Sequence, residues 1–429
     1  RQSERKQLYR EYAEKLLASG HAYIAFDTAE EIEKMRKDHR IDEHSHAQYD
    51  SRTRGLMVNS LTLTPEEVNT RIAGGTPYVV RIKMPEHQTI TLHDMIRGEV
   101  TFDSSQSDDK VLLKADGMPT YHLAVVVDDY LMKITHAFRG EEWLPSAPVH
   151  VLLWEYLGWK AHMPQWAHLP LILKPDGNGK LSKRDGDRLG FPVFAMNWLD
   201  PKTGEITKGF KEMGFLPEAF INMLAMLGWN SGEEKELFTM QELIESFSMQ
   251  RVHKSGARFD FEKAKWFNHE WMKKTDPAAF VAPVKALLER HDIQATDDTY
   301  LLKIISLVKD RCTVTEDFYH QLSYFYQEPE TYDLEPLLKK WAANKALFFE
   351  HLQQRLTASA DWTLALVETT FKSLAEELQI KAGELQLPFR IMLVGGSYGP
   401  GVFQIAEIIG QAATLRRIQH TLSLISKTP

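Results

Sequence analysis

The strongest constraint on the fold is a strand–helix–strand order in the middle of the chain. Residues 133–138 (KITHAF) have the composition of a strand, and residues 168–173 (HLPLIL) are short and wholly apolar, as strands buried in a parallel sheet are. Between them, residues 145–159 (PSAPVHVLLWEYLGW) have a helical pattern, with Ser146 near its start and Gly158 near its end. Two strands joined through a helix form a parallel pair, so the sequence predicts a βαβ unit.

The N-terminal part mixes helices and strands. The side chains that share one face of the first predicted helix are Leu8, Tyr12 and Leu16. Gly20 follows where a helix C-terminus favours glycine. A charged helical stretch, residues 29–40, leads into a loop over residues 41–55, and residues 76–85 alternate as a strand. The side chains predicted on one face of that strand are Tyr78, Val80, Ile82 and Met84.

Beyond residue 210 strand signals fade and helices dominate. Asp276 followed by Pro277 is a favourable start for a helix over residues 277–291, because aspartate caps well and proline suits the first helical position. Further predicted helices cover residues 299–310, 335–356 and 401–419. The predicted fold class is therefore α/β in front and all-α behind.

Bulk composition narrows the class of protein. A chain of 429 residues is too long for one ordinary core and predicts two to four domains. The net charge of -8 is only a weak argument against a nucleic-acid partner. Net charge is an average, and a basic stripe can lie on an acidic protein. The single cysteine, Cys312, excludes an internal disulfide framework and fits a reducing compartment. No apolar stretch is long enough to span a bilayer, and the N-terminus has no signal-peptide pattern, so we expect a cytoplasmic protein without membrane contact.

The loop KPDGNGKLSKRDGD, residues 174–187, follows the apolar strand. Two dipeptides that favour turns, Asp176-Gly177 and Asn178-Gly179, predict that the chain bends twice there. It is not a Walker A loop, because Lys174 stands where that motif needs its first glycine and Leu181 stands where it needs serine or threonine. No G-x-G-x-x-G motif opens a helix either.

The same loop then presents Lys180, Lys183 and Arg184 close together. A lysine about 4 Å from a phosphate gains on the order of 4 kcal/mol at an effective dielectric of about 20, so the cluster can hold a polyanion. A solvated basic turn has the same composition. On the residues alone both interpretations stay open.

A second cluster of polar and aromatic residues lies upstream of the loop. Its members are Tyr121, His122, Asp128, Asp129, Arg139, Glu141, Glu142 and Trp143. Arg139 ends a predicted parallel strand, the position at which open α/β sheets place ligands. An arginine there can grip a carboxylate through two parallel hydrogen bonds, or it can form a salt bridge with a neighbouring acid. Neither interpretation is excluded.

Three histidines, His39, His44 and His46, raise the question of a metal site. No cysteine and no spaced carboxylate accompany them, so we interpret the segment as a solvated loop and expect no metal site in the protein itself.

Taken together, these residues resemble glutamyl-tRNA synthetase, a family of class I aminoacyl-tRNA synthetases. The phrases that carry the resemblance are RQSERKQLY, LLKADGMPTYHLAVVVDD, THAFRGEEWLPSAPVHVLLWEYLGW, LPLILKPDGNGKLSKRDGD, GFLPEAFINMLAMLGW, FDFEKAKWFN and GPGVFQIAEIIG. They cover essentially the whole chain, and KLSKR is similar to the class I KMSKS signature loop. The resemblance implies that ATP with Mg²⁺, L-glutamate and tRNA(Glu) are bound, that glutamyl-adenylate forms, and that glutamate passes to the terminal adenosine of the tRNA.

The resemblance also implies roles for particular residues of the catalytic part. Lys183 and Lys180 would contact ATP phosphates, together with Ser182 of the same loop. Tyr121 and Arg139 would hold the glutamate substrate, with Arg139 on its side-chain carboxylate. The side chains expected to line the adenylate pocket are Asp129, Glu142 and Trp143.

At other positions the chain departs from the family in one place and agrees with it in two. Val125 stands where the family has an asparagine that contacts substrate. Arg311 and Arg390 fall where the family has anticodon-reading arginines, and arginine suits the stacking and edge hydrogen bonds through which single-stranded bases are read. Arg311 fits an enzyme that discriminates tRNA(Glu) from tRNA(Gln), although a non-discriminating enzyme remains the alternative.

The resemblance predicts a domain order as well. An acceptor-stem insertion of α+β type and the end of the catalytic region would occupy residues 1–125, and the second half of a class I Rossmann domain residues 126–175. The signature loop and a helical stem-contact domain would follow in 176–276, and an all-α anticodon-binding region in 277–429, split near 330. We expect a monomer.

One departure from the family concerns the start of the chain. No H-x-G-H motif is present, although class I enzymes carry one near the beginning of their Rossmann fold. The expectation is that this stretch of chain by itself activates glutamate poorly, or serves only as a tRNA-binding fragment.

Overall fold

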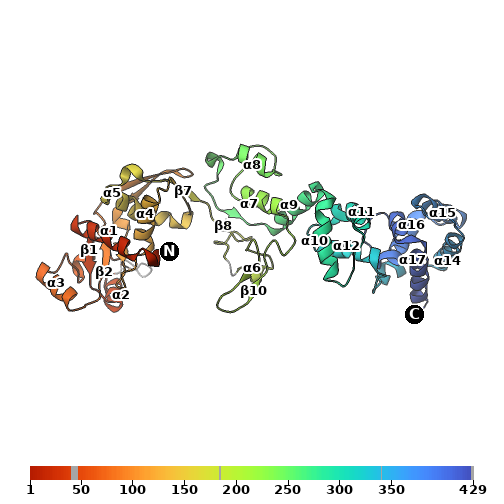
Figure 1. Cartoon of the computed structure of the whole chain (residues 1–429), viewed down its shortest axis with the longest axis horizontal. Coiled ribbons are helices and arrows are strands. Elements are labelled where there is room, and N and C mark those ends of the chain that lie inside the picture. The colour runs from red at the N-terminus through yellow and green to blue at the C-terminus, as the bar shows by residue number, and fades with distance from the viewer. Residues whose placement is uncertain (40–46, 183–184, 340, 427–429) are drawn as a thin grey trace. The chain divides into compact units, whose positions relative to one another are not determined.

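The computed structural model describes residues 1–39, 47–182, 185–339 and 341–426 (Figure 1). The chain divides into two compact units. The first unit comprises residues 1–181, 226–235 and 244–259, and the second comprises 182–225, 236–243 and 260–429. Within the described residues, no helix is long and apolar enough to cross a membrane.

The first unit contains the strands that the sequence predicted, together with others that it did not. Its helices are α1 (Lys6–Ala18), α2 (Ala29–Asp38), α3 (Pro65–Ala73), α4 (Tyr121–Leu131) and α5 (Ala147–Tyr156). Its strands are β1 (Ala22–Ala25), β2 (Val79–Ile82), β3 (Thr89–Asp94), β4 (Gly98–Asp103), β5 (Val111–Leu113), β6 (His136–Gly140), β7 (Gln165–Leu169), β8 (Ile172–Leu173) and β11 (Ala257–Arg258).

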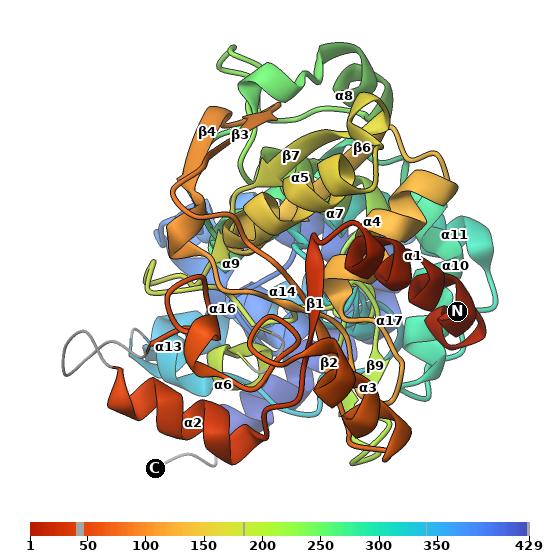
Figure 2. The ribbon, with the colours of Figure 1, turned by 90° about the vertical axis from the view of Figure 1, so that its left-hand side faces the viewer.

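The βαβ unit is confirmed. Strands β6 and β7 are parallel, with Arg139 opposite His168, and α5 connects them. They belong to a four-stranded sheet of order β4-β3-β7-β6, and α5 lies against this sheet (Figure 2). All residues from Ala147 to Trp154 are buried, so this part of α5 is covered on every side.

Two boundaries of the βαβ unit differ from the prediction, each for a local reason. The predicted strand 168–173 is interrupted at Pro170, which has no N–H to continue the ladder, so β7 ends at Leu169 and β8 pairs with β11 instead. Strand β6 begins at His136 rather than Lys133, because Lys133 has a φ of 56° and lies in the left-handed region that closes α4.

A three-stranded antiparallel sheet of order β1-β2-β5 forms the second sheet of the first unit. Of the residues predicted to share one strand face, Val80, Ile82 and Met84 are buried, and Tyr78 packs partly buried against the same core. The predicted face of α1 also meets this core, with Leu16 fully buried.

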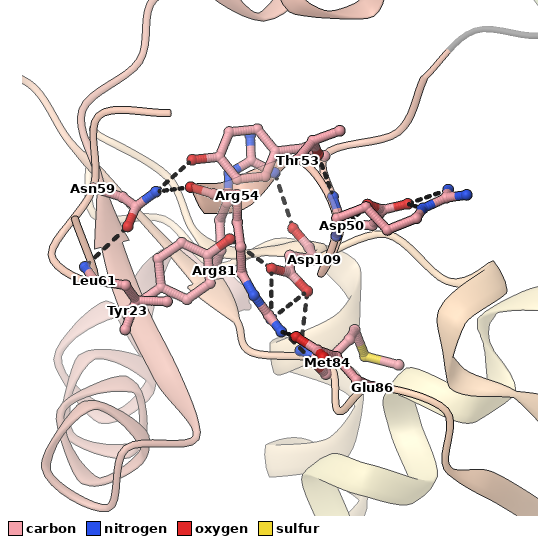
Figure 3. Close-up of polar contacts among 12 residues, drawn as sticks. Tyr23, Asp50, Thr53, Arg54, Asn59, Leu61, Arg81, Met84, Glu86 and Asp109 are labelled. Carbon is pink, nitrogen blue, oxygen red and sulfur yellow. Dashed lines mark hydrogen bonds and ion pairs between the residues drawn. The ribbon is translucent and has the colours of Figure 1, made fainter. Parts of the chain in front are cut away.

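A buried polar network joins this sheet to the segment after residue 46 (Figure 3). The carboxylate of Asp109 accepts hydrogen bonds from the Tyr23 hydroxyl (2.7 Å), from Arg54 (3.1 Å) and from the backbone N–H of Met84 (3.0 Å). Arg81 donates to the backbone carbonyl of Asp109 at 2.9 Å. The side chain of Asp109 is fully buried, and burial raises its pKa despite these donors. The network therefore holds the loop around Arg54 against β2 and β5 through one carboxylate.

The second unit is almost entirely helical. The helices that lie wholly or mostly in it are α6 (Asp185–Leu189), α7 (Pro217–Met226), α8 (Met240–Ser246), α9 (Phe261–Lys274), α10 (Val281–Glu289), α11 (Asp298–Val308), α12 (Asp317–Tyr326), α13 (Leu334–Leu338), α14 (Ala343–Thr357), α15 (Leu364–Glu377), α16 (Ala382–Val394) and α17 (Val402–Ile425). One short strand pair, β9 (Trp198–Leu199) and β10 (Ile206–Thr207), accompanies them. The predicted change from α/β to all-α is confirmed.

Most helix boundaries in the second unit follow the predicted signals, but the predicted helix 401–419 is interrupted at Gly410, whose φ of 84° and ψ of 166° are not helical. The Asp276 side chain accepts from the N–H of Ala278 at 2.9 Å, although the first turn is a 3-10 helix (Pro277–Phe280) before α10 begins. The predicted single helix 335–356 is wrong: α13 ends at Leu338, and Ala342 is extended before α14.

Candidate active site

Arg139 lies one residue before the end of β6, at the carboxyl edge of the parallel strands, as predicted. Its side chain is only 9% exposed. The guanidinium carbon lies 5.0 Å from the centroid of the Trp166 ring on β7. A cation packed on an indole in this way is held in one orientation and shielded from water.

A salt bridge does accompany Arg139, which was one of the two interpretations left open. Nη2 lies 3.5 Å from Oδ2 of Asp129 in α4. Burial raises the pKa of Asp129, while the charge of Arg139 opposes that rise. The separation is longer than that of a close bidentate pair, so the guanidinium keeps donors for another carboxylate.

Tyr121 and Trp143 form an aromatic wall beside this guanidinium. Their ring centroids are 4.6 Å apart, and the Arg139 guanidinium carbon lies 5.9 Å from the Tyr121 ring. Tyr121 is 37% exposed and Trp143 41%, so both rings can meet a ligand from solvent. Burial of the remaining part raises the pKa of Tyr121, which keeps its hydroxyl protonated as a donor.

The innermost contact of Arg139 is a histidine. Nη1 lies 2.8 Å from Nδ1 of His150 on α5, and Nε2 of His150 lies 3.1 Å from Nδ1 of His122 on α4. His150 is fully buried. Thus His122 of α4, His150 of α5 and Arg139 of β6 form one chain of hydrogen bonds.

The loop after β8 is a hairpin that bends twice, as predicted. Gly177 and Gly179 have φ values of 79° and 85°. The N–H of Asn178 donates to the Asp176 side chain at 2.9 Å, and Lys180 pairs with Leu173 across the hairpin. Glycine is therefore required at both bends, and the turn delivers Lys180 at its far end.

Lys180 contacts the carboxylate of Glu142, in the 3-10 helix Glu141–Ser146 that directly follows β6. The hydrogen bond from Lys180 lowers the pKa of Glu142. The neighbouring Glu141 contacts Arg97 and accepts from the N–H of Leu171 at 3.3 Å. Glu141 and Glu142 thus link the carboxyl edge of the sheet to the hairpin loop. Glu141 contacts the segment that leads into the hairpin, and Glu142 contacts its far end.

The remaining loop residues fall in a different unit or outside the described residues. Ser182 is the first residue of the second unit, and its N–H and hydroxyl donate to Asp185 at 2.8 and 2.6 Å. Lys183 and Arg184 lie outside the described residues. The structure therefore brings together six of the predicted site residues: Tyr121, Asp129, Arg139, Glu142, Trp143 and Lys180.

The two predicted anticodon-reading arginines lie in the second unit. Arg390 on α16 donates through Nη1 to the carbonyls of Tyr398 (3.1 Å), Gly399 (3.0 Å) and Pro400 (2.5 Å). Burial and the nearby charge of Arg311 lower the pKa of Arg390. Burial raises the pKa of Tyr324, and the charges of Arg390 and Arg311 both oppose that rise, so both arginines lie near its hydroxyl.

Two further sequence interpretations concern residues around this framework. Val125 packs partly buried against the hydrophobic core, so its apolar side chain supplies no polar contact. Of the three histidines once considered for metal, His39 is described and His44 and His46 lie outside the described residues.

Sequence reasoning missed His150. A signal was available: His150 is the one titratable residue in the otherwise apolar segment Ala147–Trp154, and a buried imidazole needs a polar partner. It also missed the buried pair of Asp94 and His168, 2.7 Å apart on β3 and β7. Burial alone would raise the pKa of Asp94, but hydrogen bonds from His168 and two backbone N–H groups outweigh it and lower that pKa.

Comparison with known proteins agrees with this architecture. The family model described as tRNA synthetases class I (E and Q), catalytic domain, matches residues 1–266, and the model described as anticodon binding domain matches residues 266–422. The chain is 46% identical to glutamate–tRNA ligase of Cytophaga hutchinsonii over 429 residues, which is 100% of this chain and 83% of that relative. It is 47% identical over 426 residues to glutamate–tRNA ligase of Phocaeicola vulgatus, covering 99% of this chain and 83% of the relative.

Solved structures show the same similarity. The crystal structure of a glutamate tRNA ligase from Elizabethkingia meningosepticum in complex with its amino acid superposes with a TM-score of 0.91 at 43% identity, covering 99% of this chain and 83% of that chain. Glutamate-tRNA synthetase from Elizabethkingia anophelis gives a TM-score of 0.89 at 44% identity, with the same coverage.

The chain therefore carries the catalytic and anticodon-binding parts of a class I tRNA synthetase of the E and Q type, and the catalytic match extends from the first unit into the second. Within that class, the chain belongs to the glutamate–tRNA ligase family, enzymes that activate glutamate with ATP and charge tRNA(Glu).

Proposed function

We propose that the carboxyl edge of β6 is where this chain binds the side chain of L-glutamate. The observation that supports this most is Arg139, a guanidinium only 9% exposed whose nearest carboxylate contact, with Asp129, is 3.5 Å long. A substrate carboxylate completes its hydrogen bonding, whereas the neutral amide of glutamine leaves the buried charge unpaired. Tyr121 lies beside the guanidinium and holds the same substrate.

ATP occupies the adjoining region between Trp143 and the hairpin loop. Lys180 and Lys183 neutralise the phosphates, Ser182 supports the loop, and Asp129, Glu142 and Trp143 line the pocket for the adenylate. Mg²⁺, when bound with ATP, neutralises charge on the phosphates. Such an ion is held by substrate phosphates and one or two carboxylates, and the carboxylate of Glu142 next to Lys180 fits that requirement.

The reaction has two steps. The α-carboxylate of glutamate attacks the α-phosphate of ATP, a phosphorus–oxygen bond forms, and pyrophosphate leaves. A ribose hydroxyl of the terminal adenosine of tRNA(Glu) then attacks the activated carbonyl, and AMP leaves. Since the substrates supply both nucleophiles, the protein contributes position and electrostatic stabilisation.

The second unit supplies the contacts with the anticodon. Arg311 and Arg390 read its bases, and we propose that they favour tRNA(Glu). The protein acts as a cytoplasmic monomer, and the domain boundaries near residues 125, 175, 276 and 330 stand as part of this proposal.

Pyrophosphate exchange by the full-length protein, with glutamate, ATP and tRNA(Glu), tests the proposal. Lys183→Ala is expected to reduce exchange while the dissociation constant for tRNA(Glu) stays nearly unchanged. An unaltered exchange rate would remove the loop from the mechanism. Charging of purified tRNA(Gln) at the rate of tRNA(Glu) would instead show a non-discriminating enzyme.

A further inference from the structure

We infer that His150, supported by His122, is a positioning residue that orients the Arg139 guanidinium towards the side-chain carboxylate of glutamate without neutralising its charge. This inference rests on the proposed role of Arg139. It assigns a function to two side chains behind the substrate pocket, one of which is fully buried.

The direction of the hydrogen bonds follows from which groups can donate. A guanidinium has only N–H donors, so Nδ1 of His150, 2.8 Å from Nη1 of Arg139, must accept. The single ring proton of His150 then lies on Nε2 and is donated to Nδ1 of His122 at 3.1 Å. Arg139 thus fixes the tautomer of both histidines. Each hydrogen bond in the chain is donated in the same direction, from Arg139 to His150 and from His150 to His122.

The surroundings keep both imidazoles neutral. Burial, followed by the charge of Arg139, holds the pKa of His150 well below its usual value. Burial, followed by the charge of Lys110, lowers the pKa of His122 to about 4. Near neutral pH, Nδ1 of His150 is therefore available as an acceptor.

A neutral acceptor differs from an acid in its effect on the substrate. A carboxylate at the position of His150 would pair with the guanidinium and compete with the glutamate side chain. The imidazole fixes the orientation of Arg139 and leaves its positive charge to the substrate. The Trp166 ring, 5.0 Å from the guanidinium carbon, restricts the same group from another side. His150 therefore contributes to the choice of glutamate over glutamine.

The test compares variants of the full-length protein in pyrophosphate exchange with tRNA(Glu). His150→Leu removes the acceptor and is expected to raise KM for glutamate by about 10- to 100-fold, the effect of losing a hydrogen bond to a charged group. KM for ATP should change less than about twofold. His150→Gln keeps an acceptor oxygen and should recover most of the loss. His136→Gln, an exposed histidine on the same strand as Arg139, is the matched control.

The preference for glutamate is the second measurement. His150→Leu should reduce the ratio of kcat/KM for glutamate over glutamine, because a loosely held guanidinium discriminates less. An increase in KM for ATP equal to that for glutamate would indicate a merely structural role and overturn the inference. Equal behaviour of the leucine and glutamine variants would also overturn it.

Two further variants separate the possible failures. If Arg139→Gln leaves KM for glutamate unchanged, the proposed function itself fails. If Arg139→Gln raises KM but His150→Leu does not, only the role of His150 is refuted. Should His150→Leu not fold, His122→Phe removes just the outer bond at a partly exposed position. A rise of a few-fold in KM for glutamate is then expected, and an unchanged KM would refute the inference.

Discussion

Lys180, at the far end of the hairpin loop, contacts the carboxylate of Glu142, which follows β6 by two residues. The ammonium group is thus held by an ion pair in which both side chains are exposed to solvent, Lys180 by 56% and Glu142 by 33%. Exposed pairs contribute roughly 0–1 kcal/mol to stability, so this one is weak enough for a phosphate to replace. The contact places Lys180 at the carboxyl edge of the sheet without locking it there.

Lys180→Ala is therefore expected to separate stability from activity. The free energy of unfolding should fall by less than about 1 kcal/mol, since only a surface pair is lost. Pyrophosphate exchange should fall by about 100-fold, because a preorganised charge at the phosphates is removed. Lys160→Ala, which breaks an exposed pair with Glu155 elsewhere in the same unit, should change neither quantity appreciably. Equal losses in both variants would argue against a role for Lys180 with ATP.

The Asp109 network gives a prediction about stability. Asp109→Ala leaves Arg54 with only the more distant Glu86, at 3.6 Å, as an acid partner in this network, and it removes the acceptor of the Tyr23 hydroxyl. Breaking a buried ion pair from one side costs about 3–5 kcal/mol. Denaturant unfolding followed by tryptophan fluorescence measures the loss. Asp108→Asn, at the preceding and more exposed carboxylate, should cost less than about 1 kcal/mol. A similar small loss at Asp109 would contradict the structural role given to the network.

The lowered pKa of His122 predicts how the stability of the first unit changes at acidic pH. Its pKa of about 4 in the folded protein lies below the value of about 6.5 expected in the unfolded chain. Between these values the unfolded state binds more protons, so this contribution to stability is complete above about pH 6.5 and is lost as the pH falls towards 4.

Replacing His122 by glutamine should remove this dependence. Between pH 7 and pH 4, the wild-type protein is expected to lose on the order of 3 kcal/mol more than the variant. Unfolding midpoints measured across this range provide the comparison, and His93→Gln, an exposed histidine, serves as the control. Parallel pH profiles for the wild type and His122→Gln would show that His122 does not titrate on unfolding.

Local sequence signals predicted the elements of the site better than their contacts. Hydrophobic patterning and turn glycines give β6, α5 and the bends at Gly177 and Gly179, because these features depend on neighbouring residues. The break at Pro170 was equally local, and weighing the missing N–H would have predicted it.

The pairing of side chains was not predictable in the same way. His150 meets Arg139 because α5 packs back on the sheet after the crossover, and Lys180 meets Glu142 across 38 residues of chain. Such contacts depend on the packing of whole elements, which no local period encodes. Sequence could place Arg139 at a strand end, but it could not choose between a carboxylate and an imidazole as its inner partner.

Arg390 provides a prediction about tRNA. Nη1 of its guanidinium contacts three successive carbonyls of the turn at residues 398–400, so the turn orients the planar group. Lysine cannot reproduce the fork of donors that this group presents. Arg390→Lys keeps the charge and loses the fork. Affinity for tRNA(Glu) should fall by about tenfold, because a base contact is worth about 1–3 kcal/mol.

The salt dependence of binding shows what kind of contact is lost. Lysine would still neutralise a phosphate, so this comparison uses Arg390→Gln, which removes the charge. If Arg390 reads a base, the slope of log K against log salt should be the same for the wild type and Arg390→Gln, since no phosphate contact disappears. A slope smaller by about one, with equal weakening for every tRNA, would mean that Arg390 binds a phosphate instead. Arg355, an exposed arginine of the same helical unit that pairs with Glu377, gives the matched controls: Arg355→Lys should leave the affinity unchanged, and Arg355→Gln should leave the slope unchanged.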